Sequence, residues 1–142
     1  MSMASPEIQE LARQLLAFEA TQSGASDAPV GATLRVIEEL RLRLIRLAGV
    51  DGFRSLLSRS LTLARAEASC LNQAHVSANG ILEGFDGIED NQAAGQAGRV
   101  LVAHLLALLM TFIGESLTLR LVRESWPEAS MSEVDLRIEE RP

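Results

Sequence analysis

The sequence contains no lysine, no tyrosine and a single cysteine, Cys70. One cysteine cannot form a disulfide framework within the chain, and this scarcity is typical of proteins from reducing compartments. The first residues lack the basic and then apolar run of a secretory signal, so we expect a cytoplasmic protein. Net charge is −6, which argues against extensive non-specific contact with nucleic acid.

What is present is typical of a globular protein. Of the 142 residues, 47% are hydrophobic and 23% are charged, which excludes a wholly disordered or fibrous chain. The length fits one helical domain over residues 1–142. Within it we expect a Ser/Gly/Ala/Asp-rich loop at 22–29 and a C-terminal extension at 128–142. The frequent leucines favour helices, and the middle of the chain is basic between acidic flanks.

Hydrophobic periodicity predicts four helices. The first covers about 6–21, with Ser5 as N-cap and Pro6 at the first helical position. A second is expected over 30–48 and a third over 52–72, separated at Gly49. In the second helix, a coiled-coil-like leucine seam is surrounded by surplus apolar residues, which favours burial against a second copy of the chain. The seam comprises Ile37, Leu40, Leu44 and Leu47, and the surplus residues are Leu34, Leu42 and Ile45.

The fourth helix is expected to run from about 92 to 126 without a break, as the centre of a four-helix bundle. Residues 100–113 are apolar on nearly every side, which is typical of a helix buried in a core or a membrane. This run is shorter than the roughly 20 residues of a membrane span and contains His104. We therefore predict a soluble core helix and no membrane contact.

Two short segments carry β signals. Asn79-Gly80 stands between apolar residues, and this pair favours a type I′ turn, so a small hairpin is expected over about 75–85. Near the C-terminus, apolar and charged residues alternate strictly from Val134 to Glu139. Such a pattern predicts a half-buried strand, paired within the chain or with a second chain; a disordered acidic tail is the alternative.

A polar stripe accompanies the fourth helix and provides the candidate site. Residues 104 and 115 would lie about 20° apart around one helix and about 16 Å apart along it. We expect a buried polar seam in which Glu115 pairs with an arginine of the third helix, because a buried carboxylate without a partner would protonate. The candidate residues are His104, Thr111, Glu115, Thr118, Arg54, Arg59 and Arg65. A ligand pocket lined by His104 and Glu115 is the functional alternative.

A histidine phosphotransfer-like domain is a further alternative. Ala103-His104 and Gly114 match positions of that motif, whereas Ala107 and Leu108 stand where its lysine and glycine belong. The leucines around His104 also predict burial, whereas phosphotransfer needs an exposed imidazole. No catalytic residue, cofactor or metal site is predicted: Cys70 and two histidines are too few for zinc, and the glycines lack the context of a phosphate loop.

Three segments resemble a small, uncharacterised bacterial helical protein family with no known function. They are residues 52–59, the run 79–84, and residues 112–122 continuing to Trp126-Pro127. The resemblance implies a free-standing bacterial protein and transfers no site. Taken together, the sequence predicts a mainly α, non-enzymatic interaction or regulatory module that forms a homodimer, has a protein partner and binds no nucleic acid.

Overall fold

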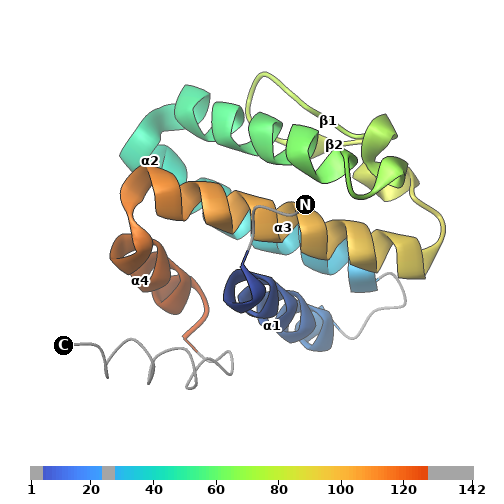
Figure 1. Cartoon of the computed structure of the whole chain (residues 1–142), viewed down its shortest axis with the longest axis horizontal. Helices are drawn as coiled ribbons and strands as arrows, with labels where there is room; N and C mark the ends of the chain where they lie inside the picture. The colour runs from blue at the N-terminus through green and yellow to red at the C-terminus, as the bar shows by residue number, and fades with distance from the viewer. Residues whose placement is uncertain (1–4, 24–27, 128–142) are drawn as a thin grey trace.

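The fold is mainly helical with one small hairpin, as the sequence predicts (Figure 1). The computed structural model describes residues 5–23 and 28–127. Its α-helices are α1 (Pro6–Ser23), α2 (Ala28–Arg65), α3 (Asn91–Ile113) and α4 (Glu115–Ser125). Between α2 and α3 come the 3-10 turns η1 (Ser69–Gln73) and η2 (Phe85–Gly87), with strands β1 (His75–Val76) and β2 (Leu82–Glu83) between them.

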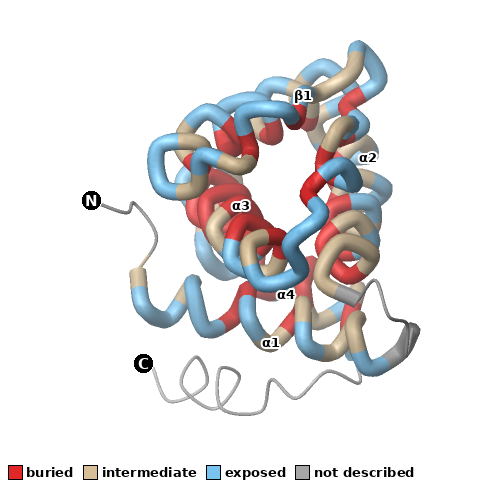
Figure 2. Tube along the Cα trace, turned by 90° about the vertical axis from the view of Figure 1, so that its right-hand side faces the viewer, coloured by how far each residue is buried: buried red, intermediate tan, exposed pale blue. Residues whose placement is uncertain are grey.

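Helix α3 is the centre of the molecule. Every residue from Leu101 to Leu109 is buried, and α1, α2 and α4 all pack against this helix (Figure 2). The carboxylate of Asp90 caps its start by accepting a hydrogen bond of 3.0 Å from the Gln92 amide. Among the described helices, α3 alone is long and apolar enough to cross a membrane, yet 61% of its apolar window is buried inside this fold. That burial confirms its prediction as a core helix.

Helix α2 consists of two straight parts that meet at Gly49, where the sequence places the boundary between two helices. Gly49 has φ 78° and ψ 169°, a combination that is essentially restricted to glycine. Its second part ends at Arg65, earlier than the predicted residue 72. Arg65 explains the early end, because its guanidinium donates to the carbonyls of Leu71 and Ala74 and so stabilises the chain as it turns back.

The prediction of one unbroken helix over 92–126 is wrong. Gly114 adopts φ 95° and ψ 154°, which ends α3 at Ile113 and sends α4 away in a new direction (Figure 1). Contacts at the far end of α4 hold that direction. The indole of Trp126 is buried and donates a hydrogen bond of 2.8 Å to Glu19 on α1.

The hairpin forms where Asn79-Gly80 predicts it, but with another turn. β1 and β2 are antiparallel, with His75 opposite Glu83 and Val76 opposite Leu82. Of the turn residues only Gly80 has positive φ, whereas a type I′ turn needs two such residues. The Gly80 amide bonds to the Ser77 carbonyl, so the connection is a type I turn followed by a left-handed glycine.

Two predicted segments fall wholly or partly outside the described residues. The strand over 133–139 lies outside them, so its pairing stays a prediction. The expected loop at 22–29 is shorter than predicted, because α1 continues to Ser23 and α2 already begins at Ala28.

Candidate functional site

The buried polar seam predicted along one long helix does not form. His104 is buried in α3, at 2% exposure, as its leucine neighbours predict. Glu115 and Thr111 are exposed, so the prediction of a buried Glu115 is wrong. Thr118 is buried, but it belongs to α4 and no longer shares a helix face with His104. The break at Gly114 is the physical reason, because it separates the residues that a continuous helix would align.

The three arginines proposed as partners of Glu115 also lie elsewhere. Arg54 is 3.9 Å from the Asp51 carboxylate, in the same part of α2. Arg59 is exposed, and Arg65 bonds to the backbone carbonyls that follow α2. The structure therefore brings none of the seven candidate residues together as a site.

His104 has a different partner, Glu67, which the sequence analysis missed. His104 Nε2 lies 2.6 Å from Glu67 Oε2, and the Glu67 side chain is 32% exposed. Nδ1 of His104 is buried without a hydrogen-bond partner among the described residues. Glu67 lies two residues beyond the end of α2, where its amide still bonds to the Ala64 carbonyl, so the last turn of α2 places it against α3. The sequence signal was the need of a buried histidine for a polar partner.

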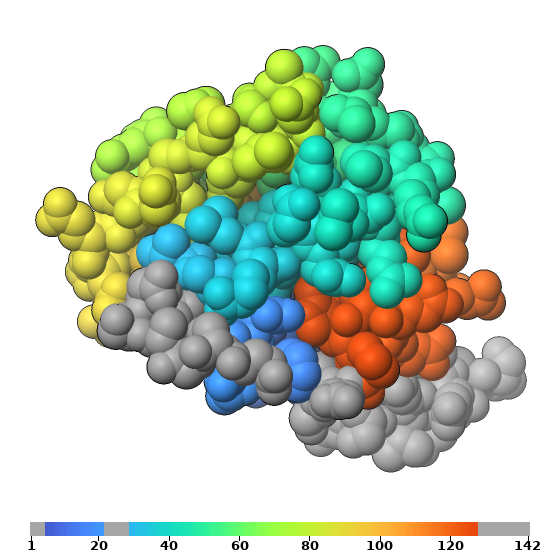
Figure 3. All heavy atoms as spheres, turned by 180° about the vertical axis from the view of Figure 1, so that it is seen from behind, coloured from blue at the N-terminus to red at the C-terminus, as the bar shows by residue number. Residues whose placement is uncertain are grey.

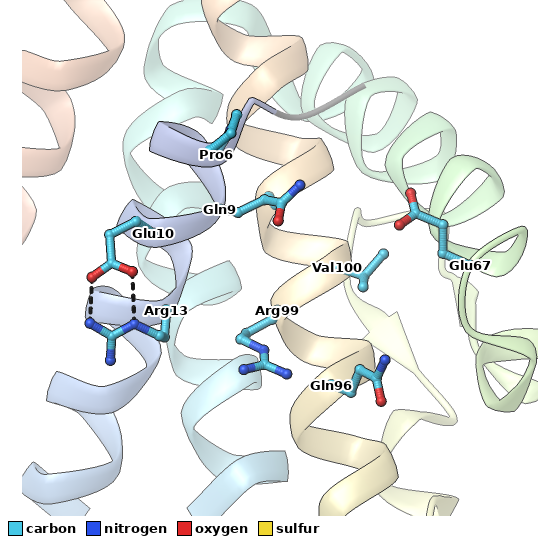
Figure 4. A pocket seen from close by; sticks show the side chains of 9 residues that line it. Pro6, Gln9, Glu10, Arg13, Glu67, Gln96, Arg99 and Val100 are labelled. Atoms are coloured by element: carbon cyan, nitrogen blue, oxygen red, sulfur yellow. Dashed lines mark hydrogen bonds and ion pairs between the residues drawn. The ribbon is translucent and has the colours of Figure 1, made fainter. Parts of the chain in front are cut away.

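Glu67 borders a cleft of about 510 Å³ between the first turns of α1 and the middle of α3 (Figure 4). Each helix lines this cleft with one face, at positions i, i+3, i+4 and i+7. From α1 these residues are Pro6, Gln9, Glu10 and Arg13, and from α3 they are Gln96, Arg99, Val100 and Ala103. The spacing was visible in the sequence, but it did not show that the two faces meet.

The charges of the cleft fall into two groups. Glu10 and Arg13 pair within α1, with Arg13 Nε donating to Glu10 Oε1 at 2.9 Å. That hydrogen bond lowers the pKa of the Glu10 carboxyl and raises the pKa of Arg13. Arg99, by contrast, forms no ion pair with any residue in 5–23 or 28–127. Among the described residues, the cleft thus presents one guanidinium without an ion pair, Arg99, and one carboxylate, Glu67, that is bonded through only one oxygen.

A second hollow of about 290 Å³ continues the groove between α1 and α3 toward the start of α3. It shares Arg13, Gln96 and Arg99 with the first, so these residues stand at the junction of the two. Its other walls are mainly small or apolar, and include Leu16, Ala20 and Pro29. The polar chemistry of the groove is therefore concentrated in the larger cleft.

Cys70 and His75 do not form a nucleophile–base pair. The thiol of Cys70 lies 3.9 Å from the Ala93 carbonyl, and the exposed imidazole of His75 bonds across the hairpin to Glu83 at 2.9 Å. In the part of the chain that the structure describes, no group of three His, Cys, Asp or Glu side chains is placed to hold a metal ion.

Comparisons with known proteins give no match: no family model fits the chain, and no curated protein or solved structure is significantly similar to it. This agrees with the resemblance to a family without known function. The function must therefore be argued from the geometry alone.

Proposed function

We propose that this protein is a non-enzymatic interaction module of a bacterial cytoplasm and that it functions as a homodimer. Burial of His104 speaks against histidine phosphotransfer, because a phosphoryl donor needs direct access to an imidazole nitrogen. In the structure, Nε2 is occupied by Glu67 and Nδ1 is buried.

The proposal rests on three exposed apolar residues at the bend of α2 and the end of α3, which we call the apolar tip. We define it as Leu47, Val50 and Phe112, which are 55%, 38% and 61% exposed. Leu47 and Val50 flank the bend of α2 at Gly49, and Phe112 precedes the end of α3. The bend of α2 lies beside the junction of α3 and α4 in both views of that end (Figures 1 and 3).

Exposed apolar residues that gather in one place favour association rather than simple solvation. The rest of the predicted leucine seam is used inside the monomer, since Ile37, Leu40 and Leu44 are all buried. Leu47 is the member that remains exposed at the tip. In a two-fold dimer the same patch from each copy would cover the other, so every apolar contact would be made twice.

The test is the mass of the protein in solution, measured by light scattering over a range of concentrations. We expect a mass near twice 15.4 kDa for the wild-type chain. Phe112→Ser should weaken dimerisation at least tenfold, because each buried Phe side chain contributes about 1.5–3 kcal/mol. Phe112→Leu is the matched control and should keep the dimer. A wild-type monomer at high micromolar concentration would contradict the proposal.

A further inference from the structure

Arg99 and Glu67 line the cleft between α1 and α3 with opposite charges and form no salt bridge with each other. The guanidinium of Arg99 has no ion pair within the described residues, and Glu67 uses only Oε2, in its bond to His104. Glu10 and Arg13 already satisfy each other and add no net charge. A ligand that carries both a cationic and an anionic group would satisfy both open positions at once.

The His104–Glu67 pair is a second observation, because it holds the Glu67 carboxylate in place at the cleft. Burying an imidazole with Nδ1 unpaired is unfavourable, so an apolar residue at position 104 would suit the core of α3 better. What the histidine contributes is a 2.6 Å bond that fixes the carboxylate of Glu67 at the edge of the cleft. A carboxylate fixed in this way is preorganised to accept a hydrogen bond from a cationic group.

The separation of the two charges selects the kind of zwitterion. Val100 lies between Glu67 and Arg99 in the cleft (Figure 4). The two charged side chains come from different elements, Arg99 from α3 and Glu67 from the chain just beyond α2, so the two charges are not adjacent. An α-amino acid carries its charges on adjacent carbons and is too short for this separation. A short peptide is long enough, and the amide of Gln96 offers a hydrogen-bond partner for its peptide groups.

We propose that this cleft binds a short peptide with free ends, whose terminal carboxylate contacts Arg99 and whose terminal ammonium contacts Glu67. The cleft volume of about 510 Å³ accommodates two or three small residues. This inference goes beyond the proposed dimer and is independent of it, because the cleft contains none of the three residues of the apolar tip.

The experiment is isothermal titration calorimetry of the full chain with triglycine. Two blocked probes accompany it: N-acetyl-triglycine lacks the ammonium, and triglycine amide lacks the carboxylate. We expect triglycine to bind with a Kd of about 1 mM or tighter, and each blocked probe to bind at least tenfold more weakly. Equal binding of all three probes would overturn the proposal, and so would no binding of triglycine up to about 10 mM.

Variants assign each end of the peptide to its residue. Arg99→Gln and Glu67→Gln should each weaken triglycine binding about tenfold, while Arg59→Gln removes a similarly exposed arginine outside the cleft and should change nothing. In Glu67→Gln the amide oxygen can still accept from His104, so this variant should fold. The Glu67→Gln protein should no longer discriminate against N-acetyl-triglycine; if it still does, the assignment of the ammonium to Glu67 is wrong.

Discussion

Gly98 lies where α3 crosses the first part of α2, and replacing it with alanine should destabilise the fold. A Cβ atom at this position would stand 2.1 Å from Thr33 Oγ1 and 3.3 Å from Thr33 Cγ2. Thr33 is 1% exposed, and its hydroxyl donates to the Pro29 carbonyl at 2.9 Å. Both branches of the threonine are close to the new atom, so a rotation about χ1 exchanges one clash for another. The two helices would have to move apart.

The expected size of the effect follows from three contributions. Overpacking of a closely packed core costs about 1–3 kcal/mol. Loss of the hydrogen bond from Thr33 to Pro29 would add about 1 kcal/mol. Alanine is better than glycine inside a helix by roughly 0.5–1 kcal/mol, which offsets part of this cost. We therefore expect Gly98→Ala to lower the free energy of unfolding by about 2 kcal/mol.

Gly95 offers a matched control on the same helix, about one turn earlier. A Cβ atom there would meet only Pro29 Cβ at 3.7 Å, an ordinary contact. Gly95→Ala should therefore stabilise the protein by roughly 0.5–1 kcal/mol. Denaturant unfolding followed by circular dichroism measures both changes. If Gly98→Ala were as stable as Gly95→Ala, the close approach of α2 and α3 at Thr33 would be refuted.

Three further changes test separate parts of the structure. In Gly114→Ala the new Cβ atom would have no atom within 4 Å, so only the backbone conformation should make it unfavourable. The free energy of unfolding, measured with denaturant, should fall by about 1–3 kcal/mol. An unchanged value would mean that α3 continues through this position. Glu67→Ala should lower the free energy of unfolding by about 1–3 kcal/mol, because it leaves the buried imidazole of His104 unpaired. His104→Leu removes the imidazole itself and should lower it less. Equal losses in the two variants would contradict the pairing. The pKa of Glu10, measured by NMR, should lie below its ordinary value and should rise in Arg13→Gln. The pair should therefore stabilise the fold at neutral pH, and this stabilisation should be lost as the pH falls through the folded-state pKa of Glu10.

The sequence predicted elements well where local signals agree with the packing. Ser5 and Pro6 mark the start of α1, and the apolar run 100–113 identifies the helix that the others surround. Gly49 is predicted as a boundary because glycine is typical of the end of a helix, and the structure bends α2 there. Gly114 is not predicted as a boundary, because an isolated glycine costs a helix only about 1 kcal/mol and the sequence runs on to Trp126 without a proline.

The break at Gly114 is determined by contacts between α4 and residues far away in the chain. Trp126 bonds to Glu19, and Glu124 lies 3.6 Å from Arg43 on α2. Only a helix that turns at Gly114 brings both residues to these partners while α3 stays in the core. The choice is thus made by tertiary contacts at the end of α4, which no local pattern near residue 114 reveals.

The same reasoning explains why the candidate site moved from Glu115 to Glu67. A histidine within an apolar run needs a polar partner, and the sequence establishes that need without naming the partner. Glu115 was chosen because a continuous helix would place it on the same face. The chain instead supplies Glu67, 37 residues before His104, through the early end of α2 at Arg65. The break at Gly114 takes Glu115 off the helix face that carries His104 and leaves it exposed, whereas Glu67, just beyond α2, lies against α3 and meets the imidazole. Partners of buried polar groups are therefore more sensitive to helix ends than the core is, because a small shift of an end leaves the apolar face in place but redirects a charged side chain.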